Sequence, residues 1–332
     1  MTTWLVTGGA GYIGSHVTRA LLAAGEGVVV VDDLSTGAKD RLPDGVAAEI
    51  AKVHDRAVVE QLIRTHQVGG VIHIAAKKRV GESVDRPTWY YEENLEGLRT
   101  LLDVAVAAGI DKFVFSSSAA VYGEVDVDLV TEQTPCTPAS PYGETKLVGE
   151  WMIKGVARAQ RLAGRDFGYA NLRYFNVAGA GAPELGDPVA LNLIPMVFEK
   201  LEAGQAPLIF GDDYASPDGT CIRDYIHVAD LAEAHVAAAL RLSRDPKAAL
   251  TLNLGTGTGA SVKEVITTIL DHTGIDLPPV IVPRRPGDPV RLVASADRAR
   301  EELGWSASRD LAEMISSAWT GWRHRHDTSG DE

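Results

Sequence analysis

The feature that most constrains this chain is a glycine-rich turn between a short apolar run and a helical pattern. The run Trp4-Leu5-Val6 leads into Thr7-Gly8-Gly9-Ala10-Gly11-Tyr12-Ile13-Gly14, and a helix is expected from His16 to Ala24. Glycines at this spacing permit a tight turn, a close approach of the backbone to a pyrophosphate, and close packing of helix on strand. The free N–H groups and partial positive charge of a helix N-terminus favour an anion. The pattern predicts a dinucleotide-binding turn.

An acid follows at the position where such a unit needs one. The β-branched run Val28–Val31 reads as a buried strand and ends in Asp32-Asp33, with Asp32 standing 24 positions after Gly8. A carboxylate there can accept hydrogen bonds from the adenosine ribose, and its charge repels a 2′-phosphate. We therefore expect NAD as the cofactor, in preference to NADP.

Strands and helices continue to alternate through the first half of the chain. Strands are expected near 46–53, 70–76, 112–115 and 169–175, and helices over 55–66, 87–108 and 141–162. This alternation predicts an α/β fold with a doubly wound parallel (Rossmann) sheet, whose site lies beyond the carboxyl ends of the strands.

After Gly179 the elements become shorter and mixed. Helices are expected near 192–203, 229–242, 261–272 and 309–324, and strands near 207–210, 251–254 and 279–282. We expect an NAD-binding domain over 1–178, a smaller α/β substrate-binding part over 179–325, and a polar tail over 326–332.

Tyr142 and Lys146 stand four residues apart on a predicted helix and so share one face. The cation is expected to lower the pKa of the phenol below its usual value of about 10, which makes Tyr142 a candidate acid/base. Alone, this spacing is common on solvated helix surfaces. Ser118, at the end of a predicted strand, can bond the same substrate hydroxyl. No G-x-S-x-G sequence surrounds Ser118, which argues against a hydrolase.

Longer motifs carry a resemblance that covers nearly all of residues 3–325. They are Thr7–His16, Val80–Ser83, Phe115–Gly123, Ser140–Gly143, Leu172–Asn176, Asp218–Thr220, Arg223–Val228 and Arg284–Asp288. With these motifs the chain resembles the extended short-chain dehydrogenase/reductase family and, within it, the UDP-sugar 4-epimerases.

The resemblance implies an NAD-dependent enzyme that inverts C4 of a UDP-hexose, interconverting UDP-glucose and UDP-galactose. Tyr142 as phenolate would take the proton of the sugar 4-hydroxyl while C4 gives a hydride to NAD. The transient 4-keto sugar would then present its other face, and it would take back the hydride from the cofactor and the proton from Tyr142. Lys146 would also reach the nicotinamide ribose. The resemblance further implies a homodimer formed through the helices at about 87–108 and 141–162.

The resemblance, together with the turn and the acid, assigns the site residues to three sets. The catalytic residues are Ser118, Tyr142 and Lys146. The cofactor-binding residues are Gly8, Gly11, Tyr12, Ile13, Asp32, Asp33, Leu34, Ser35, Thr36, Gly37, Lys78, Asn94, Ser116, Tyr142, Lys146 and Phe175. The substrate-binding residues are Ser118, Tyr142, Asn176, Asn192, Leu193, Leu208, Phe210, Arg223, Arg285, Asp288 and Leu292.

Several of these positions have a stated task. Arg223 and Arg285 suit the diphosphate through charge-assisted bonds. Asp288 suits the uridine ribose, Phe210 the uracil ring, and Leu292 falls beside the sugar 2-substituent.

The chain departs from the family pattern at the adenine end of the predicted cofactor site. Lys52 stands where the family usually has an acid that contacts the adenine edge, and Glu93 stands where it often has an asparagine. The way in which adenine is held is therefore open. Lys78 resembles the family's cofactor-loop lysine, whereas Lys77 and Arg79 beside it are expected to be solvated.

Charge and composition exclude other classes. The net charge of -13 argues against a nucleic-acid partner or an anionic membrane surface. The longest aliphatic run, Val28–Val31, is too short to span a bilayer, and the N-terminus does not resemble a signal peptide, so a cytoplasmic protein is expected. Cys136 and Cys221 lack a metal-ligand spacing. Free thiols are expected, with one disulfide left open, and no metal site is expected.

Four alternatives stand beside the main hypothesis. Epimerisation of UDP-glucuronate is kept open by Arg79 and Arg291, and that of UDP-N-acetylglucosamine by Leu292. A nucleotide-sugar 4,6-dehydratase needs an acid pair beside the site, but Ala119-Ala120 follow Ser118. A silent NAD-binding regulator is disfavoured because the serine, tyrosine and lysine are all present.

Overall fold

A sheet of seven parallel strands forms the centre of the computed structural model, which describes residues 1–285 and 288–328. The strand order β11-β6-β5-β4-β1-β2-β3 contains the order of a dinucleotide-binding fold, so the predicted doubly wound parallel sheet is confirmed. The strands are β1 (Thr3–Thr7), β2 (Gly27–Asp32), β3 (Ala47–Ile50), β4 (Gly70–His73), β5 (Lys112–Ser118), β6 (Gly168–Tyr174) and β11 (Ala249–Leu254).

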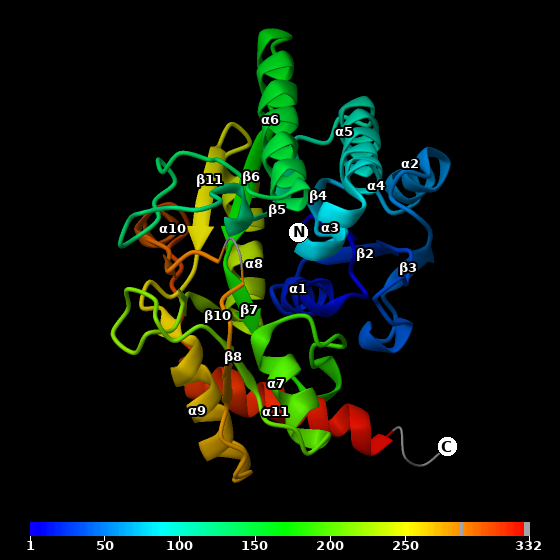
Figure 1. The fold of residues 1–332 in the computed structure, drawn as a ribbon. Helices are drawn as coiled ribbons and strands as arrows, with labels where there is room; N and C mark the ends of the chain where they lie inside the picture. The colour runs from blue at the N-terminus through cyan, green and yellow to red at the C-terminus, as the bar shows by residue number, and fades with distance from the viewer. Residues whose placement is uncertain (286–287, 329–332) are drawn as a thin grey trace.

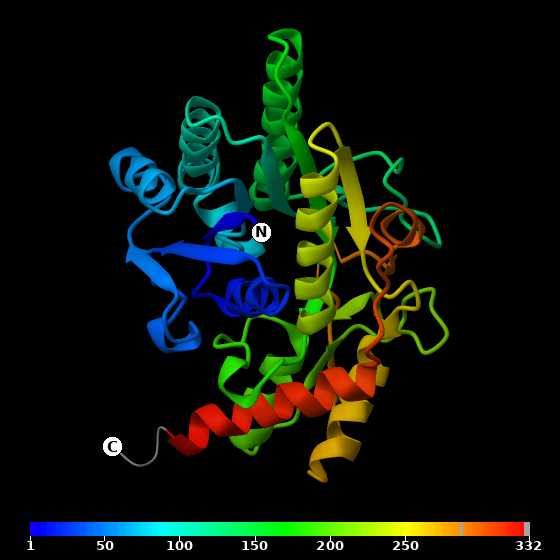
Figure 2. The ribbon, with the colours of Figure 1, turned by 180° about the vertical axis from the view of Figure 1, so that it is seen from behind.

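Helices cover both faces of this sheet (Figures 1 and 2). Successive strand side chains point to opposite faces, so Trp4 and Val6 pack with α1 (Tyr12–Ala23) and α8 (Val228–Arg244). Leu5 packs on the other face, with α2 (Arg56–Thr65), α5 (Gly97–Ala107) and α6 (Pro141–Leu162). Shorter elements beside these are η1 (Lys39–Arg41), α3 (Val80–Asp85), α4 (Pro87–Tyr91) and η3 (Ala119–Val121).

The helix that carries Tyr142 and Lys146 begins and ends where the sequence predicts. Ser140 caps α6 by accepting a hydrogen bond from the Gly143 N–H at 3.3 Å, and Pro141 occupies the first turn, where its missing donor costs nothing. Tyr142 and Lys146 therefore lie in the first two turns, beside the carboxyl end of β5.

A second core lies at the end of the molecule opposite to the projecting helices α5 and α6 (Figures 1 and 2). It is formed mainly by α7 (Leu193–Glu202), α9 (Val262–Thr273), α11 (Leu311–Thr328) and β8 (Leu208–Phe210). The remaining elements are β7 (Asn176–Ala178), η4 (Pro183–Leu185), β9 (Ile222–Arg223), β10 (Tyr225–His227), β12 (Ala260–Ser261), β13 (Val280–Val282), β14 (Arg291–Leu292) and α10 (Asp297–Leu303).

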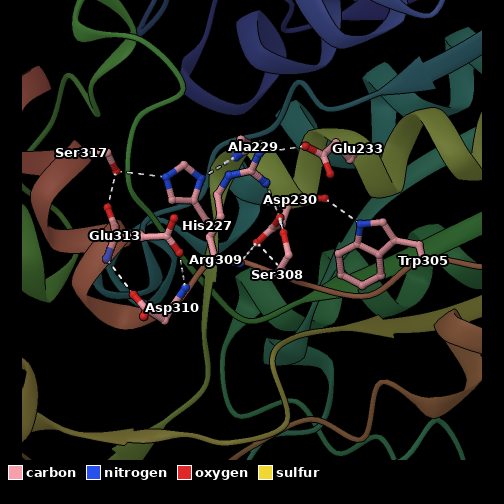
Figure 3. A network of polar contacts seen from close by, with 10 residues as sticks. All are labelled: His227, Ala229, Asp230, Glu233, Trp305, Ser308, Arg309, Asp310, Glu313 and Ser317. Carbon is pink, nitrogen blue, oxygen red and sulfur yellow. Dashed lines mark hydrogen bonds and ion pairs between the residues drawn. The ribbon is translucent and has the colours of Figure 1, made fainter.

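A buried carboxylate ties this lobe to the sheet (Figure 3). Asp230, in the first turn of α8, accepts hydrogen bonds from the backbone N–H groups of Ser308 at 3.2 Å and Arg309 at 3.0 Å. The Arg309 guanidinium also pairs with Asp230, and the Trp305 indole donates to the Asp230 carbonyl at 3.0 Å. The segment leading into α11 is thereby fixed to a helix that covers the main sheet.

The structure corrects two expectations about the elements. The strand expected at 251–254 in the smaller part is β11, which pairs with β6 in the main sheet because five of its six residues are buried and need cover on both faces. The helix expected over 87–108 is interrupted by a π-helical segment, η2 (Glu92–Glu96).

The C-terminus also differs from the expected polar tail at 326–332. Helix α11 continues to Thr328, and residues 329–332 lie outside the described part of the chain. Among the residues that the structure describes, no helix is both long and apolar enough to cross a membrane.

Candidate active site

A cleft of about 410 Å³ runs along the carboxyl ends of the parallel strands. In the order of the strands, Lys52 follows the edge strand β3, Asp32 ends β2, the glycine turn follows β1, and Ser118 ends β5, beyond β4. This is the edge at which open parallel sheets bind their ligands.

The cleft brings together most of the predicted cofactor residues and the three catalytic ones. The predicted residues that line it are Gly8, Gly11, Tyr12, Ile13, Asp32, Asp33, Ser35, Thr36, Lys78, Ser118, Tyr142, Lys146, Phe175, Asn176, Asn192 and Leu292. The predicted residues outside its lining are Leu34, Gly37, Asn94, Ser116, Leu193, Leu208, Phe210, Arg223, Arg285 and Asp288.

The glycine turn has the geometry that a dinucleotide requires. Gly8 has φ +71°, and a Cβ at Gly14 would stand 1.9 Å from the Gly8 carbonyl oxygen, so neither position tolerates a side chain. Within the described part of the chain, no side chain caps the N-terminus of α1, which leaves its first N–H groups available to an anion.

The Asp32 carboxylate can accept hydrogen bonds from a ribose in addition to those that it accepts from neighbouring loops. Its two carboxylate oxygens accept from the Ala10 N–H at 2.9 Å and the Leu34 N–H at 2.8 Å. Each oxygen can still accept a second bond. Burial raises the pKa of this carboxyl. The uncapped helix, the glycine cradle and this acid fit the diphosphate and adenosine ribose of NAD.

The three catalytic candidates meet at the far side of the turn. Ser118 shares a hydrogen bond with the Tyr142 phenol, and its oxygen also accepts from the Ala120 N–H at 3.2 Å. The Lys146 ammonium donates to the Ser116 carbonyl at 2.8 Å and stands 5.9 Å from the Tyr142 ring centroid. Ser116 is therefore an anchor for the lysine, rather than part of the cleft wall.

The expectation that Lys146 lowers the pKa of Tyr142 is wrong for the protein without ligands. Burial raises the pKa of Tyr142, and the Ser118 hydrogen bond offsets only part of that rise. Burial also lowers the pKa of Lys146 to about 7. Both groups lose water when buried, and the lysine is directed to a carbonyl, so desolvation outweighs their mutual attraction.

Lys77 is not simply solvated, which corrects a second expectation. Its ammonium donates to the Ser35 hydroxyl at 2.9 Å and stands 3.7 Å from Asp33, so it bridges two cofactor-side loops. Lys78 lines the cleft as an exposed side chain. Asn94 holds the Lys77 backbone, accepting from its N–H at 2.8 Å, and donates to Thr145 at 3.0 Å. It thus positions the loop after β4.

Sequence reasoning missed a buried network behind Ser118. Glu150, one turn after Lys146 on α6, accepts from the Ser117 hydroxyl at 2.7 Å and from Nε and Nη2 of Arg173 at 2.7 and 2.6 Å. Arg173 also donates to the Tyr122 hydroxyl at 3.0 Å. The available signal was a glutamate four residues after Lys146 on the same face of the helix.

The predicted substrate residues fall into two groups. Asn176, Asn192 and Leu292 line the cleft. Arg223 instead donates to the Pro289 carbonyl at 2.7 Å and stands 3.4 Å from Asp288, so these two predicted groups pair with each other.

Arg285 lies with its guanidinium carbon 3.7 Å from the Phe210 ring centroid. The predicted uracil position is therefore covered by an arginine in this structure. Pro286 and Gly287 of the same motif lie outside the described residues.

Cys136 and Cys221 are both free thiols, so the disulfide left open by the sequence is not formed. Among the described residues, no cluster of three or more His, Cys, Asp or Glu side chains has the arrangement to hold a metal ion.

Comparison with known proteins agrees with this geometry. A model of the NAD dependent epimerase/dehydratase family matches residues 4–255. The chain is 45% identical to the UDP-glucose 4-epimerase of Azospirillum brasilense over 329 residues, covering 98% of this chain and 93% of that protein.

Solved structures match over almost the whole chain. UDP-glucose 4-epimerase from Stenotrophomonas maltophila, with bound NAD and formylated UDP-arabinopyranose, has a TM-score of 0.93 at 40% identity, covering 99% of this chain and 100% of that one. The enzyme from Bifidobacterium longum in complex with NAD+ and UDP has a TM-score of 0.88 at 37% identity, covering 98% and 99%. On the matched domain, the shared fold and the full-length identity, this chain belongs to the NAD dependent epimerase/dehydratase family.

Proposed function

We propose that this protein interconverts UDP-glucose and UDP-galactose by inverting C4 of the hexose, the activity for which its relatives are named. The observation that carries the proposal is that Ser118, Tyr142 and Lys146 line the same cleft as the glycine turn. An oxidation at C4 needs a proton acceptor beside a hydride acceptor, and this arrangement supplies the place for both.

NAD, when bound, supplies the hydride acceptor and returns the hydride, and the chain's own residues move and hold the proton. Tyr142 takes the proton of the sugar 4-hydroxyl and gives it back after the 4-keto sugar has turned. Ser118, already bonded to the phenol, donates to the developing phenolate and so lowers its energy. Lys146, whose pKa of about 7 lies near neutrality, contributes positive charge to the same group.

Substrate residues are assigned by what reaches the cleft. Asn176 and Asn192 present amides that suit sugar and diphosphate oxygens, and Leu292 limits the space beside them. We assign Arg223, Arg285 and Asp288 to the nucleotide. That assignment requires Arg223 and Asp288 to exchange their mutual 3.4 Å contact for bonds to UDP.

We further propose a homodimer formed through α5 and α6. On α6, Trp151 and Leu162 are 58% and 81% exposed, and an interface through this helix would cover apolar surface of this kind. A cytoplasmic location is supported by the two free thiols, which suit a reducing compartment. Such an activity serves galactose metabolism, since it joins the UDP-galactose and UDP-glucose pools.

The proposal is tested by incubating the purified protein with UDP-galactose, UDP-N-acetylgalactosamine or UDP-glucuronate and no added NAD. Chromatography of the nucleotide sugars should show UDP-glucose forming from UDP-galactose until equilibrium. Preference for another sugar would change the substrate, and conversion of none would refute the epimerase assignment.

A further inference from the structure

An ion pair lies in the wall of the cleft beside the end of the edge strand β3, on the opposite side of β1 from β5 and Ser118. The Lys52 ammonium stands 3.0 Å from Oε1 of Glu93, and both residues line the cleft. The Glu93 side chain is only 12% exposed, whereas that of Lys52 is 51% exposed. The pair joins the segment after β3 to the π-helical segment η2.

The order of the strands identifies what this part of the cleft receives. The main sheet ends in the order β1, β2, β3 on this side. The turn after β1 fits the diphosphate, and Asp32 at the end of β2 fits the adenosine ribose. The next group along a dinucleotide is adenine, which therefore falls over the end of β3. Ala51 and Val53 line this part of the cleft and offer apolar contacts to a flat base.

The pair offers the donor and acceptor that the edge of adenine requires. Lys52 bonds Oε1 of Glu93, and no bond to Oε2 is found within residues 1–285 and 288–328, so this oxygen can accept. An ammonium has three protons, so Lys52 can donate to a second acceptor. Adenine presents an amino donor beside ring-nitrogen acceptors.

We propose that the Lys52–Glu93 pair recognises the adenine of the cofactor: Glu93 accepts from the N6 amino group and Lys52 donates to a neighbouring ring nitrogen. This assignment rests on the proposed use of NAD. Hydrogen bonding to Glu93 raises the pKa of Lys52, so this ammonium keeps its charge at neutral pH.

Glu93 is held in place by its neighbours. The segment Glu92–Glu96 is π-helical, a conformation that interrupts α-helices most often at functional sites. The next residue, Asn94, is buried and bonded to the Lys77 backbone and to Thr145. The backbone of Glu93 is thereby fixed before a ligand arrives, as a recognition group requires.

The test compares NAD with nicotinamide hypoxanthine dinucleotide, which carries a carbonyl oxygen in place of the N6 amino group and a proton on N1. The purified holoprotein is equilibrated with equal concentrations of both, desalted, and its bound dinucleotides are quantified by chromatography. Because the carbonyl would face the Glu93 carboxylate, NAD should be retained about tenfold over the analogue, the worth of one charge-assisted bond.

Glu93→Gln should bring the two dinucleotides to within about threefold, because a glutamine amide can rotate and donate to the carbonyl. The matched control is Glu92→Gln, the same chemical change one residue earlier on an exposed side chain, which should keep the wild-type ratio. Lys52→Gln, at a half-exposed position, should also lower the ratio of retained NAD to retained analogue. This variant provides the test if Glu93→Gln fails to fold.

Equal retention of the two dinucleotides by the wild type, or an unchanged ratio in Glu93→Gln and Lys52→Gln, would overturn the assignment and leave the proposed epimerase function standing. A protein that retains neither dinucleotide would overturn the NAD assignment itself, and the inference with it.

Discussion

The buried pair of Glu150 and Arg173 should be the most sensitive point behind the catalytic residues. Their side chains are 0% and 4% exposed, and Glu150 also accepts from Ser117, the neighbour of Ser118. Burial alone would lower the pKa of Arg173, but the hydrogen bonds and charge of Glu150 raise it above its usual range. Arg173 therefore stays charged, and the Glu150 carboxylate balances that buried positive charge.

Glu150→Met removes that compensation while keeping most of the volume. An unpaired buried charge costs about 3–5 kcal/mol, and the lost Ser117 bond costs about 1 kcal/mol. We expect the free energy of unfolding to fall by about 4–6 kcal/mol, a large share of the roughly 5–15 kcal/mol that folded proteins have. Urea unfolding followed by tryptophan fluorescence measures this fall.

The double variant Glu150→Met/Arg173→Met separates the charge from the packing. Because no unpaired charge remains, it should recover about 2 kcal/mol of the loss. Glu144→Met, in the first turn of the same helix and half-buried, should lower the free energy of unfolding by less than about 1 kcal/mol. A double variant no more stable than Glu150→Met would refute this reasoning.

Three further outcomes follow from the site. Tyr142→Phe should lower kcat by about 10²–10⁴-fold with NAD still bound, as measured by turnover and released cofactor; undiminished turnover would contradict its proton role. Since burial lowers the pKa of Lys146 from 10.5 to about 7, the unfolded chain binds more protons between these values, so this group makes stability rise with pH there. Unfolding of the cofactor-free protein should show that slope, and Lys146→Met should reduce it. Gly14→Ala should abolish NAD binding because its Cβ would stand 1.9 Å from the Gly8 oxygen, whereas Gly81→Ala, which meets nothing within 4 Å, should bind NAD normally.

The main sheet was predictable because its signals are local. Continuous apolar runs mark strands that are buried on both faces, and the turn after β1 contains its own chemistry. The strand β11 was misplaced for the same reason: its sequence marks a buried strand but not its partner, and β6 lies some 80 positions earlier in register, as with Thr251 and Asn171. Partner choice is a property of the assembled sheet.

The sequence predicts which residues lie on the catalytic face of the helix, but it does not predict their protonation states. Spacing places Tyr142 and Lys146 on one face of a helix, and α6 confirms that face. Their protonation depends on burial, which the spacing does not contain. Desolvation acts on both groups in the cofactor-free protein, raising the pKa of the phenol and lowering that of the lysine. Tyr142 is therefore protonated in the cofactor-free protein, and bound cofactor and substrate must lower its pKa before it can act as a base.

The adenine end of the cleft shows why single departures from a pattern can mislead. Lys52 and Glu93 are 41 positions apart, and each alone replaces a residue that suits a dinucleotide with one of unsuitable charge. The structure places them 3.0 Å apart, so the two changes cancel in charge and leave one acceptor and one donor facing the cleft. Replacing Lys52 alone would leave the mostly buried Glu93 carboxylate without its cation beside the base, whereas Lys52 is half-exposed and stays solvated if Glu93 is replaced. If the pair recognises adenine, Lys52→Gln alone should therefore cost more affinity for NAD than the double substitution Lys52→Gln/Glu93→Gln, as titration of the cofactor-free variants with NAD would measure.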